Sequence, residues 1–349
     1  MRKIQRPVPA GLLTALLVTL LLVTGCQKQT EPAQSTIFAM DTVMNLTIYP
    51  PEKQDGTQAL NSAVEQVYAL EQEMSATRED SPIYALNHSG GQWVELPQLL
   101  PLLKDSLALC QQTRGALDLT TYPALEAWGF LSKNYRVPPP QELAELAEHI
   151  DYTMLELSDT GARLPEPMQL DLGAVAKGYA GDVLVPALKE QGVTSALLDL
   201  GQSTIVTIGT KPDGTPWRIG IQDPFGRRDY LGVLELADLA VGTSGGYQRF
   251  FEENGQTYWH IIDPDTAAPA RSGLALVTVV SPSALTCDGL STALFVMGLE
   301  EGTQFWRDHP ELDFQALFIT DEGEIYLTPG LEEQFSPAQE HSGKVKVLQ

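Results

Sequence analysis

A carboxylate and a hydroxyl group stand four positions apart in the segment Cys-Asp-Gly-Leu-Ser-Thr-Ala, which runs from Cys287 to Ala293. The segment predicts a helix, in which Asp288 and Thr292 lie on one face, a single turn apart. Both side chains offer the hard oxygen ligands that Mg²⁺ requires, and Mg²⁺ usually fills its other positions with water and substrate phosphate oxygens. The pair is therefore a candidate Mg²⁺ site. The alternative is that Asp288 caps the helix and Thr292 packs in the core.

A high density of small residues marks the segment Asp-Leu-Gly-Ala-Val-Ala-Lys-Gly-Tyr-Ala-Gly-Asp, residues 171–182. Gly173, Ala176 and Ala180 recur at helical spacing, so a helix here has one nearly flat face that another surface can approach closely. We expect Asp171 to be its N-cap and Lys177 to lie further along it. The approaching surface is either a ligand or a neighbouring element of the core, and the pattern by itself leaves both open.

Two further polar blocks lie between these segments, Val-Gly-Thr-Ser-Gly-Gly-Tyr-Gln-Arg-Phe at residues 241–250 and Tyr-Trp-His-Ile-Ile-Asp-Pro at residues 258–264. Residues 242–246 match G-x-S-x-G, the nucleophile elbow of α/β-hydrolases. That fold requires an acid and then a histidine after the serine, whereas His260 precedes Asp263 and the region predicts antiparallel strands. A serine hydrolase is therefore disfavoured, and His260 is the histidine that lies in a predicted strand beside a motif.

The elements that must position these residues are predicted from hydrophobic spacing. Two amphipathic helices fill the first third of the chain, one through Leu60 to Met74 and one through Leu99 to Cys110. The run Val137–Pro140 cannot continue a helix, and a further helix restarts over Gln141–Ile150, so this run is a connector or a seam between lobes.

Short β-rich runs follow, several of them separated by turn residues that suit hairpins. They are Ala196–Leu200, Thr204–Ile208, Trp217–Ile221, Leu231–Leu236, Tyr258–Ile262, Leu276–Val280 and Ala316–Thr320. The sequence thus predicts an α+β fold with antiparallel sheets and packed helices.

The amino terminus has the pattern of an export signal. Basic residues precede an apolar run over Gly11–Val23, which has the length of a signal-peptide core. The following Val-Thr-Gly-Cys resembles a bacterial lipobox, in which Cys26 becomes the lipidated first residue of the mature protein. We therefore expect a lipoprotein signal peptide at 1–25, a lipidated tether at 26–36 and a catalytic domain at 37–349, with the protein anchored to the bacterial membrane on its extracytoplasmic side. An ordinary signal peptide or an uncleaved anchor is the alternative.

Composition narrows the possible partners and the redox chemistry. The formal net charge is −23, so nucleic acid is a poor partner for this surface. Apart from Cys26, the cysteines are Cys110 and Cys287, which are too few for a disulfide framework. Both lie in apolar segments, and we expect them to be buried packing residues.

Taken in order, the motifs resemble the ApbE family of FAD:protein FMN transferases. The resemblance runs from about Phe38 to Phe335 and is specific because the blocks occur together and in sequence. The blocks are Phe38–Met44, Met74-Ser75 with Asn87, Gly115–Asp118 through Trp128–Phe130, residues 171–182, the Thr243–Gly245 and His260–Pro264 blocks, and Asp288–Ala293.

The resemblance implies a T-fold-like α+β enzyme that binds FAD in an extended groove, with Mg²⁺ at the pyrophosphate. The implied flavin-site residues are Met40, Ala116, Leu117, Asp118, Asp171, Lys177 and Ile262. The implied Mg²⁺ ligands are the Ala174 carbonyl, Asp288 and Thr292, so the residues 171–182 would be small to give FAD and its metal access to the backbone. Asp288 is also expected to act in catalysis, and His260 is expected to orient or deprotonate the acceptor hydroxyl, with a purely structural role as its alternative.

The implied reaction joins FMN from FAD to a Ser or Thr hydroxyl of a target protein and releases AMP. The implied targets are exported or membrane-bound flavoproteins of electron transport with a Thr-containing flavinylation motif. The chain departs from the family pattern at two places. After the predicted strand that ends at Leu200 it has Gly201-Gln202-Ser203 where the family has Gly-Gly-Asn or Gly-Gly-Asp, and after the 258–264 block it has Thr266-Ala267 where the family has Thr-Gly in a turn. The alternatives are a Mg²⁺-dependent FAD pyrophosphatase and a flavin-binding lipoprotein without catalysis.

Overall fold

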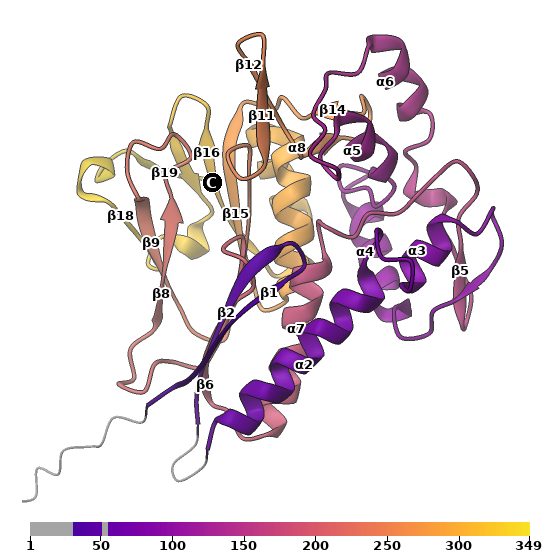
Figure 1. Cartoon of the computed structure of the whole chain (residues 1–349). Coiled ribbons are helices and arrows are strands. Elements are labelled where there is room, and N and C mark those ends of the chain that lie inside the picture. The colour runs from indigo at the N-terminus through magenta and orange to yellow at the C-terminus, as the bar shows by residue number, and fades with distance from the viewer. Residues whose placement is uncertain (1–30, 51–54) are drawn as a thin grey trace, which may run out of the picture. The chain divides into compact units, whose positions relative to one another are not determined.

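A nine-stranded sheet organises residues 31–50 and 55–349, which are the residues that the computed structural model describes (Figure 1). Neighbouring strands are antiparallel throughout, except for the last pair, which is parallel. In spatial order the strands are β1 (Ala33–Ala39), β2 (Thr42–Tyr49), β6 (Ser195–Asp199), β7 (Thr204–Ile208), β10 (Ala240–Gly245), β15 (Leu274–Ser281), β16 (Gln315–Thr320), β17 (Ile325–Leu327) and β19 (Val345–Val347).

Both faces of this sheet are covered. Helices α2 (Thr57–Met74), α7 (Ala176–Glu190) and α8 (Ala284–Asp308) pack on one face and share the main hydrophobic core with it. A smaller sheet of β18 (Phe335–Pro337), β9 (Tyr230–Leu236) and β8 (Trp217–Gln222) encloses a second core. Strand β15 is consequently buried at nearly every residue instead of alternating, as expected for a strand covered on both sides.

The remaining elements flank the main layers. They are α3 (Pro82–Asn87), α4 (Leu100–Gln112), α5 (Tyr122–Trp128), α6 (Pro140–Ala147), β3 (Val94–Glu95), β4 (Glu156–Leu157), β5 (Gly161–Arg163), β11 (Phe250–Glu253), β12 (Gln256–Trp259), β13 (Ile262–Asp263) and β14 (Ala268–Pro269). The β11–β12 hairpin packs against α5 through a small aromatic cluster that includes Trp128, Phe251 and Tyr258. The loop from β10 to β11 and the residues after β12 are therefore held at a fixed place beside the main sheet.

Most of the predicted elements are confirmed, and the α+β class is correct. One boundary is wrong: residues 33–36, expected in the tether, belong to β1, where they pair with residues 45–48 of β2. Their outward side chains are polar, so the segment has the composition of a linker although its backbone is paired. The predicted strand over residues 258–262 is also divided, because β12 ends at Trp259 and β13 starts at Ile262.

Two aspartates, the buried Asp288 and the half-buried Asp182, hold the amino-terminal parts of α7 and α8 together. Asp182 of α7 accepts hydrogen bonds from the Ala284 and Leu285 amides of α8, at 2.7 and 3.0 Å. Asp288 of α8 accepts a hydrogen bond from the Gly178 amide of α7, at 2.7 Å. The first amides of a helix have no partner within it, and a negative charge there is favoured by the helix dipole. Each helix therefore supplies an acceptor for amides in the first turn of the other, which we call reciprocal capping, and on α8 it acts beside the N-cap residue Ser283.

Glycines permit this close approach of α8 to its neighbours. A Cβ atom at Gly178 would lie 2.2 Å from the Ala284 carbonyl oxygen, and one at Gly242 of β10 would lie 2.4 Å from the Cys287 carbonyl. Such distances are impossible for a side chain, so the first turns of α8 lie directly on α7 and β10. Part of the small-residue pattern in residues 171–182 therefore serves packing, which was the alternative interpretation of that segment.

Two further expectations can be compared with the described residues. Cys110 and Cys287 are both buried and unpaired, as expected, and burial raises the pKa of each thiol. Between residues 31 and 349, leaving out 51–54, no helix has the length and apolar character needed to cross a membrane. Cys26 and the expected signal peptide lie outside the described residues.

Asp182→Ala should lower the free energy of unfolding by about 2 kcal/mol, because it leaves the Ala284 and Leu285 amides at the start of α8 without their acceptor. Urea denaturation measures this change. Glu156→Ala is the matched control, since it breaks the exposed Arg163–Glu156 ion pair and should cost less than about 1 kcal/mol. Equal losses of unfolding free energy in the two variants would contradict a structural role for the hydrogen bonds between Asp182 and α8.

Candidate functional site

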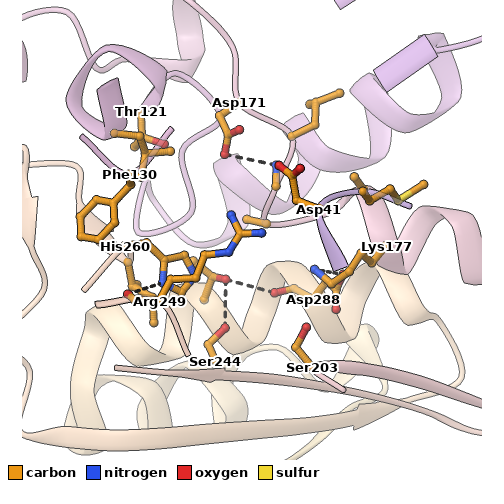
Figure 2. A pocket seen from close by; sticks show the side chains of 18 of the residues that line it. Asp41, Thr121, Phe130, Asp171, Lys177, Ser203, Ser244, Arg249, His260 and Asp288 are labelled. Carbon is orange, nitrogen blue, oxygen red and sulfur yellow. Dashed lines mark hydrogen bonds and ion pairs between the residues drawn. The ribbon is translucent and has the colours of Figure 1, made fainter. Parts of the chain in front are cut away.

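A cavity of about 800 Å³ opens where the first turns of α7 and α8 meet the β1–β2 turn and the β10–β11 loop. This volume lies within the range of small-molecule sites in proteins. The structure brings every predicted site residue of the described part to this cavity. They are Met40, Ala116, Leu117, Asp118, Asp171, Ala174, Lys177, His260, Ile262, Asp288 and Thr292. Figure 2 labels four of them, Asp171, Lys177, His260 and Asp288.

The β1–β2 turn contributes Met40 and Asp41, and both have positive φ angles, of 50° and 60°. A two-residue hairpin turn requires this conformation, but a methionine rarely adopts it. The Met40 amide donates a hydrogen bond to the Glu71 carboxylate of α2, at 2.7 Å. Backbone strain of this kind concentrates at functional sites, which agrees with the position of Met40 at the cavity wall.

Asp171 lies at the cavity wall but is not the N-cap that the sequence pattern predicted. The chain makes a turn after it, in which the Val175 and Ala176 amides both donate to the Leu172 carbonyl, so α7 starts only at Ala176. The Asp171 carboxylate instead accepts from the Gly173 amide at 3.2 Å. Burial raises the pKa of Asp171, and the Gly173 amide, Arg249 and Lys177 oppose that rise.

Asp288 is 6% exposed, and both of its oxygen atoms have partners in the protein. Oδ1 accepts from the Thr204 hydroxyl and Oδ2 from the Gly178 amide, each at 2.7 Å, while Lys177 Nζ lies 4.0 Å from Oδ2. Burial raises the pKa of Asp288, and Lys177, Thr204 and Gly178 oppose the rise. The expected alternative, a cap on its own helix, is wrong because Ser283 caps α8 and Asp288 caps α7.

Thr292 stands one turn after Asp288, and its Oγ1 lies 3.3 Å from the Asp288 carbonyl oxygen and 3.2 Å from Ser244 Oγ. Ser244 Oγ also lies 2.9 Å from Ser291 Oγ. Ser244 is inside strand β10 and bonded to hydroxyl groups, whereas a nucleophile elbow places its serine on a sharp strand-to-helix turn. The structure therefore removes the serine hydrolase interpretation of the G-x-S-x-G pattern.

The donors on this wall fit a magnesium ion. Asp288, Thr292 and Ala174 all line the cavity, and each Asp288 oxygen keeps acceptor capacity beyond the one hydrogen bond that it receives from the protein. Across residues 31–50 and 55–349 no group of three or more His, Cys, Asp and Glu side chains is arranged to hold a metal ion. Mg²⁺ suits such a sparse oxygen site because it keeps water and substrate phosphate as ligands, whereas zinc requires more nitrogen or sulfur donors.

His260 follows β12 at the opposite side of the cavity. Its Nδ1 lies 3.3 Å from the Arg249 carbonyl oxygen, and its backbone amide donates to the same oxygen at 3.1 Å. A carbonyl only accepts, so Nδ1 carries the proton and Nε2 keeps a lone pair. Burial, together with the positive charges of Arg249 and Lys177, lowers the pKa of His260 to about 4. The imidazole is therefore neutral at pH 7 and able to accept a proton.

Asp118 lines the cavity, but its carboxylate is directed at the protein. Oδ1 accepts from the Thr120 amide and hydroxyl, at 2.7 and 2.6 Å, and Oδ2 accepts from the Tyr152 amide at 2.8 Å. Burial raises the pKa of Asp118, and these hydrogen bonds oppose the rise. Asp118 therefore fastens the loop that presents Ala116 and Leu117.

The two departures from the family pattern both occupy strained turns. Gln202 has φ of 65° and Ala267 has φ of 53°. The Ala267 carbonyl accepts a hydrogen bond from Trp128 Nε1 at 2.8 Å, so a buried contact holds this turn in place. In the second turn Ala267, a residue other than glycine, thus adopts the left-handed conformation that glycine favours.

Sequence reasoning missed several residues of the cavity, and Arg249 is the most prominent of them. It lies in the 241–250 block, and its side chain projects into the cavity toward Asp171 and Asp41 (Figure 2). A usable signal was present, because Arg249 is the only Lys or Arg between Ala240 and Asp265. Glu71, Arg78 and Ser203 also line the cavity and were not predicted.

Comparisons with known proteins identify the family to which this chain is similar. The sequence profile of the ApbE family matches residues 40–318. An FAD:protein FMN transferase of Vibrio cholerae serotype O1 is 33% identical over 294 residues, which cover 82% of this chain and 87% of the relative. An FAD:protein FMN transferase of Treponema pallidum is 34% identical over 297 residues, which cover 78% of this chain and 81% of the relative.

Solved structures show the same fold. The ApbE protein of Thermotoga maritima superimposes with a TM-score of 0.79 at 29% identity, covering 90% of this chain and 99% of that one. The apo form of the Pseudomonas stutzeri flavinyl transferase ApbE gives a TM-score of 0.78 at 29% identity, covering 89% of this chain and 99% of that one.

Proposed function

The chain belongs to the ApbE family and is a flavin transferase, and on this premise we propose that it transfers FMN from FAD to a Ser or Thr hydroxyl of another protein. The product is a phosphoester-linked FMN, and AMP is released. The observation that carries the proposal is a single cavity in which a neutral His260 lies across from the pair Asp288 and Thr292. A base, an oxygen-ligand site and space for a large ligand are what this transfer requires.

FAD occupies the cavity with its flavin half against Met40, the Ala116–Leu117 loop and Ile262. Apolar walls at these residues suit a planar ring system, and the strained Met40 turn and the Asp118 hydrogen bonds hold them in position. The pyrophosphate lies toward the first turns of α7 and α8, where Lys177 supplies positive charge.

The reaction exchanges one phosphorus–oxygen bond for another. The acceptor oxygen forms a bond to the phosphorus of the FMN half, the bond from that phosphorus to the bridging oxygen breaks, and this oxygen leaves with AMP. The hydroxyl proton passes to Nε2 of His260, the ring atom that keeps a lone pair. The Arg249 carbonyl holds the other ring nitrogen and so fixes the direction of Nε2.

Mg²⁺ would be held by Asp288, Thr292 and the Ala174 carbonyl, and when bound it would neutralise pyrophosphate charge as that charge moves to the leaving group. The hydrogen bond from the Gly178 amide supports this role because it holds the Asp288 carboxylate in one orientation. A ligand that is already ordered loses little freedom when the ion arrives.

The acceptor is an exported or membrane flavoprotein subunit of electron transport with a Thr-containing flavinylation motif, and the enzyme is anchored to the same membrane surface through Cys26. Both statements rest on the lipobox-like segment before Cys26 and on the family resemblance. Covalent attachment keeps a flavin from diffusing away outside the cytoplasm, which gives this location a chemical reason.

Incubation of such an acceptor with this protein, FAD and Mg²⁺ should add the mass of one FMN to the acceptor and release an equal amount of AMP. Intact-protein mass spectrometry detects the adduct, which should disappear when the acceptor Thr is changed to Val. His260→Ala should slow the transfer by roughly 10²–10⁴-fold, the usual contribution of a general base. FMN and AMP without an adduct would identify an FAD pyrophosphatase instead, and FAD binding without AMP would identify a flavin-binding lipoprotein.

Asp288→Asn should nearly abolish AMP release, because it removes the charged Mg²⁺ ligand, whereas Thr292→Val should raise the Mg²⁺ concentration needed for half-maximal rate and be partly rescued by excess Mg²⁺. Asp182→Ala is the control, since it removes a cap from the same helix pair without removing a ligand. Melting temperatures are measured on the same preparations. A folded Asp288→Asn enzyme with turnover that EDTA does not affect would overturn the metal site.

Cys26→Ser should move the protein from the membrane fraction to the soluble fraction or stall its processing, while the purified catalytic domain keeps its activity. Fractionation and immunoblotting of cells that express the two forms provide the measurement. A Cys26→Ser protein that is fully processed and still bound to the membrane would contradict the lipid anchor.

A further inference from the structure

The cavity walls carry more acidic than basic side chains, although the proposed ligand is an anion. The acidic residues of the wall are Asp41, Glu71, Asp118, Asp171 and Asp288. The basic ones are Arg78, Lys177 and Arg249. The whole chain also has a formal net charge of −23, so an excess of positive charge elsewhere in the protein does not offset the acidic wall. The three cations of the wall therefore decide where an anionic group can bind.

Two of these three cations are already matched by a carboxylate. The Arg78 guanidinium donates from Nε and Nη2 to the two carboxylate oxygens of Asp80, at 3.1 and 3.0 Å. Lys177 Nζ lies 4.0 Å from Asp288 Oδ2. Within the described part of the chain, no carboxylate lies within 4.0 Å of the Arg249 guanidinium, although Asp171 is near enough for Arg249 to lower its pKa. Arg249 is thus the cation of the wall that has no ion pair.

The backbone of Arg249 is fixed, whereas its side chain makes no hydrogen bond or ion pair with the other residues that the structure describes. Its carbonyl oxygen accepts from the His260 amide and lies 3.3 Å from the His260 Nδ1 atom, which joins the base of the β11–β12 hairpin. The side chain is exposed and extends across the cavity between His260 and Asp171 (Figure 2). An exposed guanidinium in this position is available to a ligand that enters the cavity.

We propose that the Arg249 guanidinium binds phosphate oxygens of FAD beside His260. The planar guanidinium can donate two parallel hydrogen bonds to a phosphate group, which gives direction as well as charge. This contact stabilises the negative charge that passes to the bridging oxygen as AMP leaves. The inference rests on the proposed function, because it assumes that the cavity holds FAD.

The positive charge of Arg249 also affects His260, the proposed general base. Arg249 is one of the groups that lower the pKa of His260 and keep the imidazole neutral. Loss of the charge should raise that pKa, so the acidic limb of the pH–rate profile should move to higher pH. A residue that only stabilised the fold would not move this limb.

The test compares the binding of riboflavin, FMN and FAD, measured by flavin fluorescence, in the wild-type protein and in Arg249→Gln. We expect Arg249→Gln to weaken FMN or FAD binding by roughly tenfold to a hundredfold, the usual loss for a charged hydrogen bond, and riboflavin binding by less than about twofold. Arg249→Lys should recover part of the affinity, because it restores charge without the planar fork. Arg218→Gln is the control for loss of charge, since Arg218 is 61% exposed on β8 and outside the cavity.

Three outcomes decide the matter. Selective loss of the phosphate-bearing flavins, together with a shifted acidic limb for AMP release, supports the assignment. Unchanged FAD and FMN affinity in Arg249→Gln, or an equal loss of riboflavin binding, overturns it and leaves the proposed function standing. A wild-type protein that binds none of the three flavins would instead overturn the proposed function.

Discussion

The reciprocal capping of α7 and α8 is the interaction on which the site depends. Asp182 accepts from the first amides of α8, and Asp288 accepts from the Gly178 amide of α7. Removing these carboxylates from water, fully for Asp288 and partly for Asp182, is unfavourable and raises the pKa of both, and it is tolerated because amides at a helix start need acceptors and favour negative charge. The exchange locks two helices in one arrangement at the point where the cavity opens.

This arrangement links stability to chemistry through Asp288. The carboxylate that caps α7 also faces the cavity beside Thr292, and Lys177 and Thr204 hold it from the other side. Gly178 and Gly242 make the geometry possible, because a side chain at either position would push α8 away from α7 or from β10. The small residues of the segment 171–182 thus have two uses. Gly178 allows the helices to meet, and Gly173, Ala174 and Ala176 leave room at the cavity wall.

The opposite wall depends on the β11–β12 hairpin. Arg249 precedes the first strand of the hairpin and His260 follows the second, and a shared carbonyl joins them. The aromatic cluster with Trp128, Phe251 and Tyr258 anchors the hairpin to α5. One short hairpin therefore places a neutral imidazole beside a guanidinium that has no ion pair among the described residues, opposite the wall formed by α7 and α8.

The sequence by itself determined the α+β class, the helices α2 and α4, the strands β6, β7, β15 and β16 of the main sheet, and the family, because hydrophobic spacing and ordered motifs are local properties of the chain. The site residues that the sequence predicted in the described part of the chain all line one cavity. Tertiary structure decided what each one does there. Asp288 accepts from the Gly178 amide of α7, which lies 110 positions earlier in the chain. Asp171 precedes a turn instead of starting a helix, and Asp118 ties its loop to the Tyr152 amide. Whether Arg249 has an ion pair was likewise undetermined. Spacing along the chain reports only neighbours within a turn or a strand, whereas these partners are brought together by packing between elements that are distant in sequence.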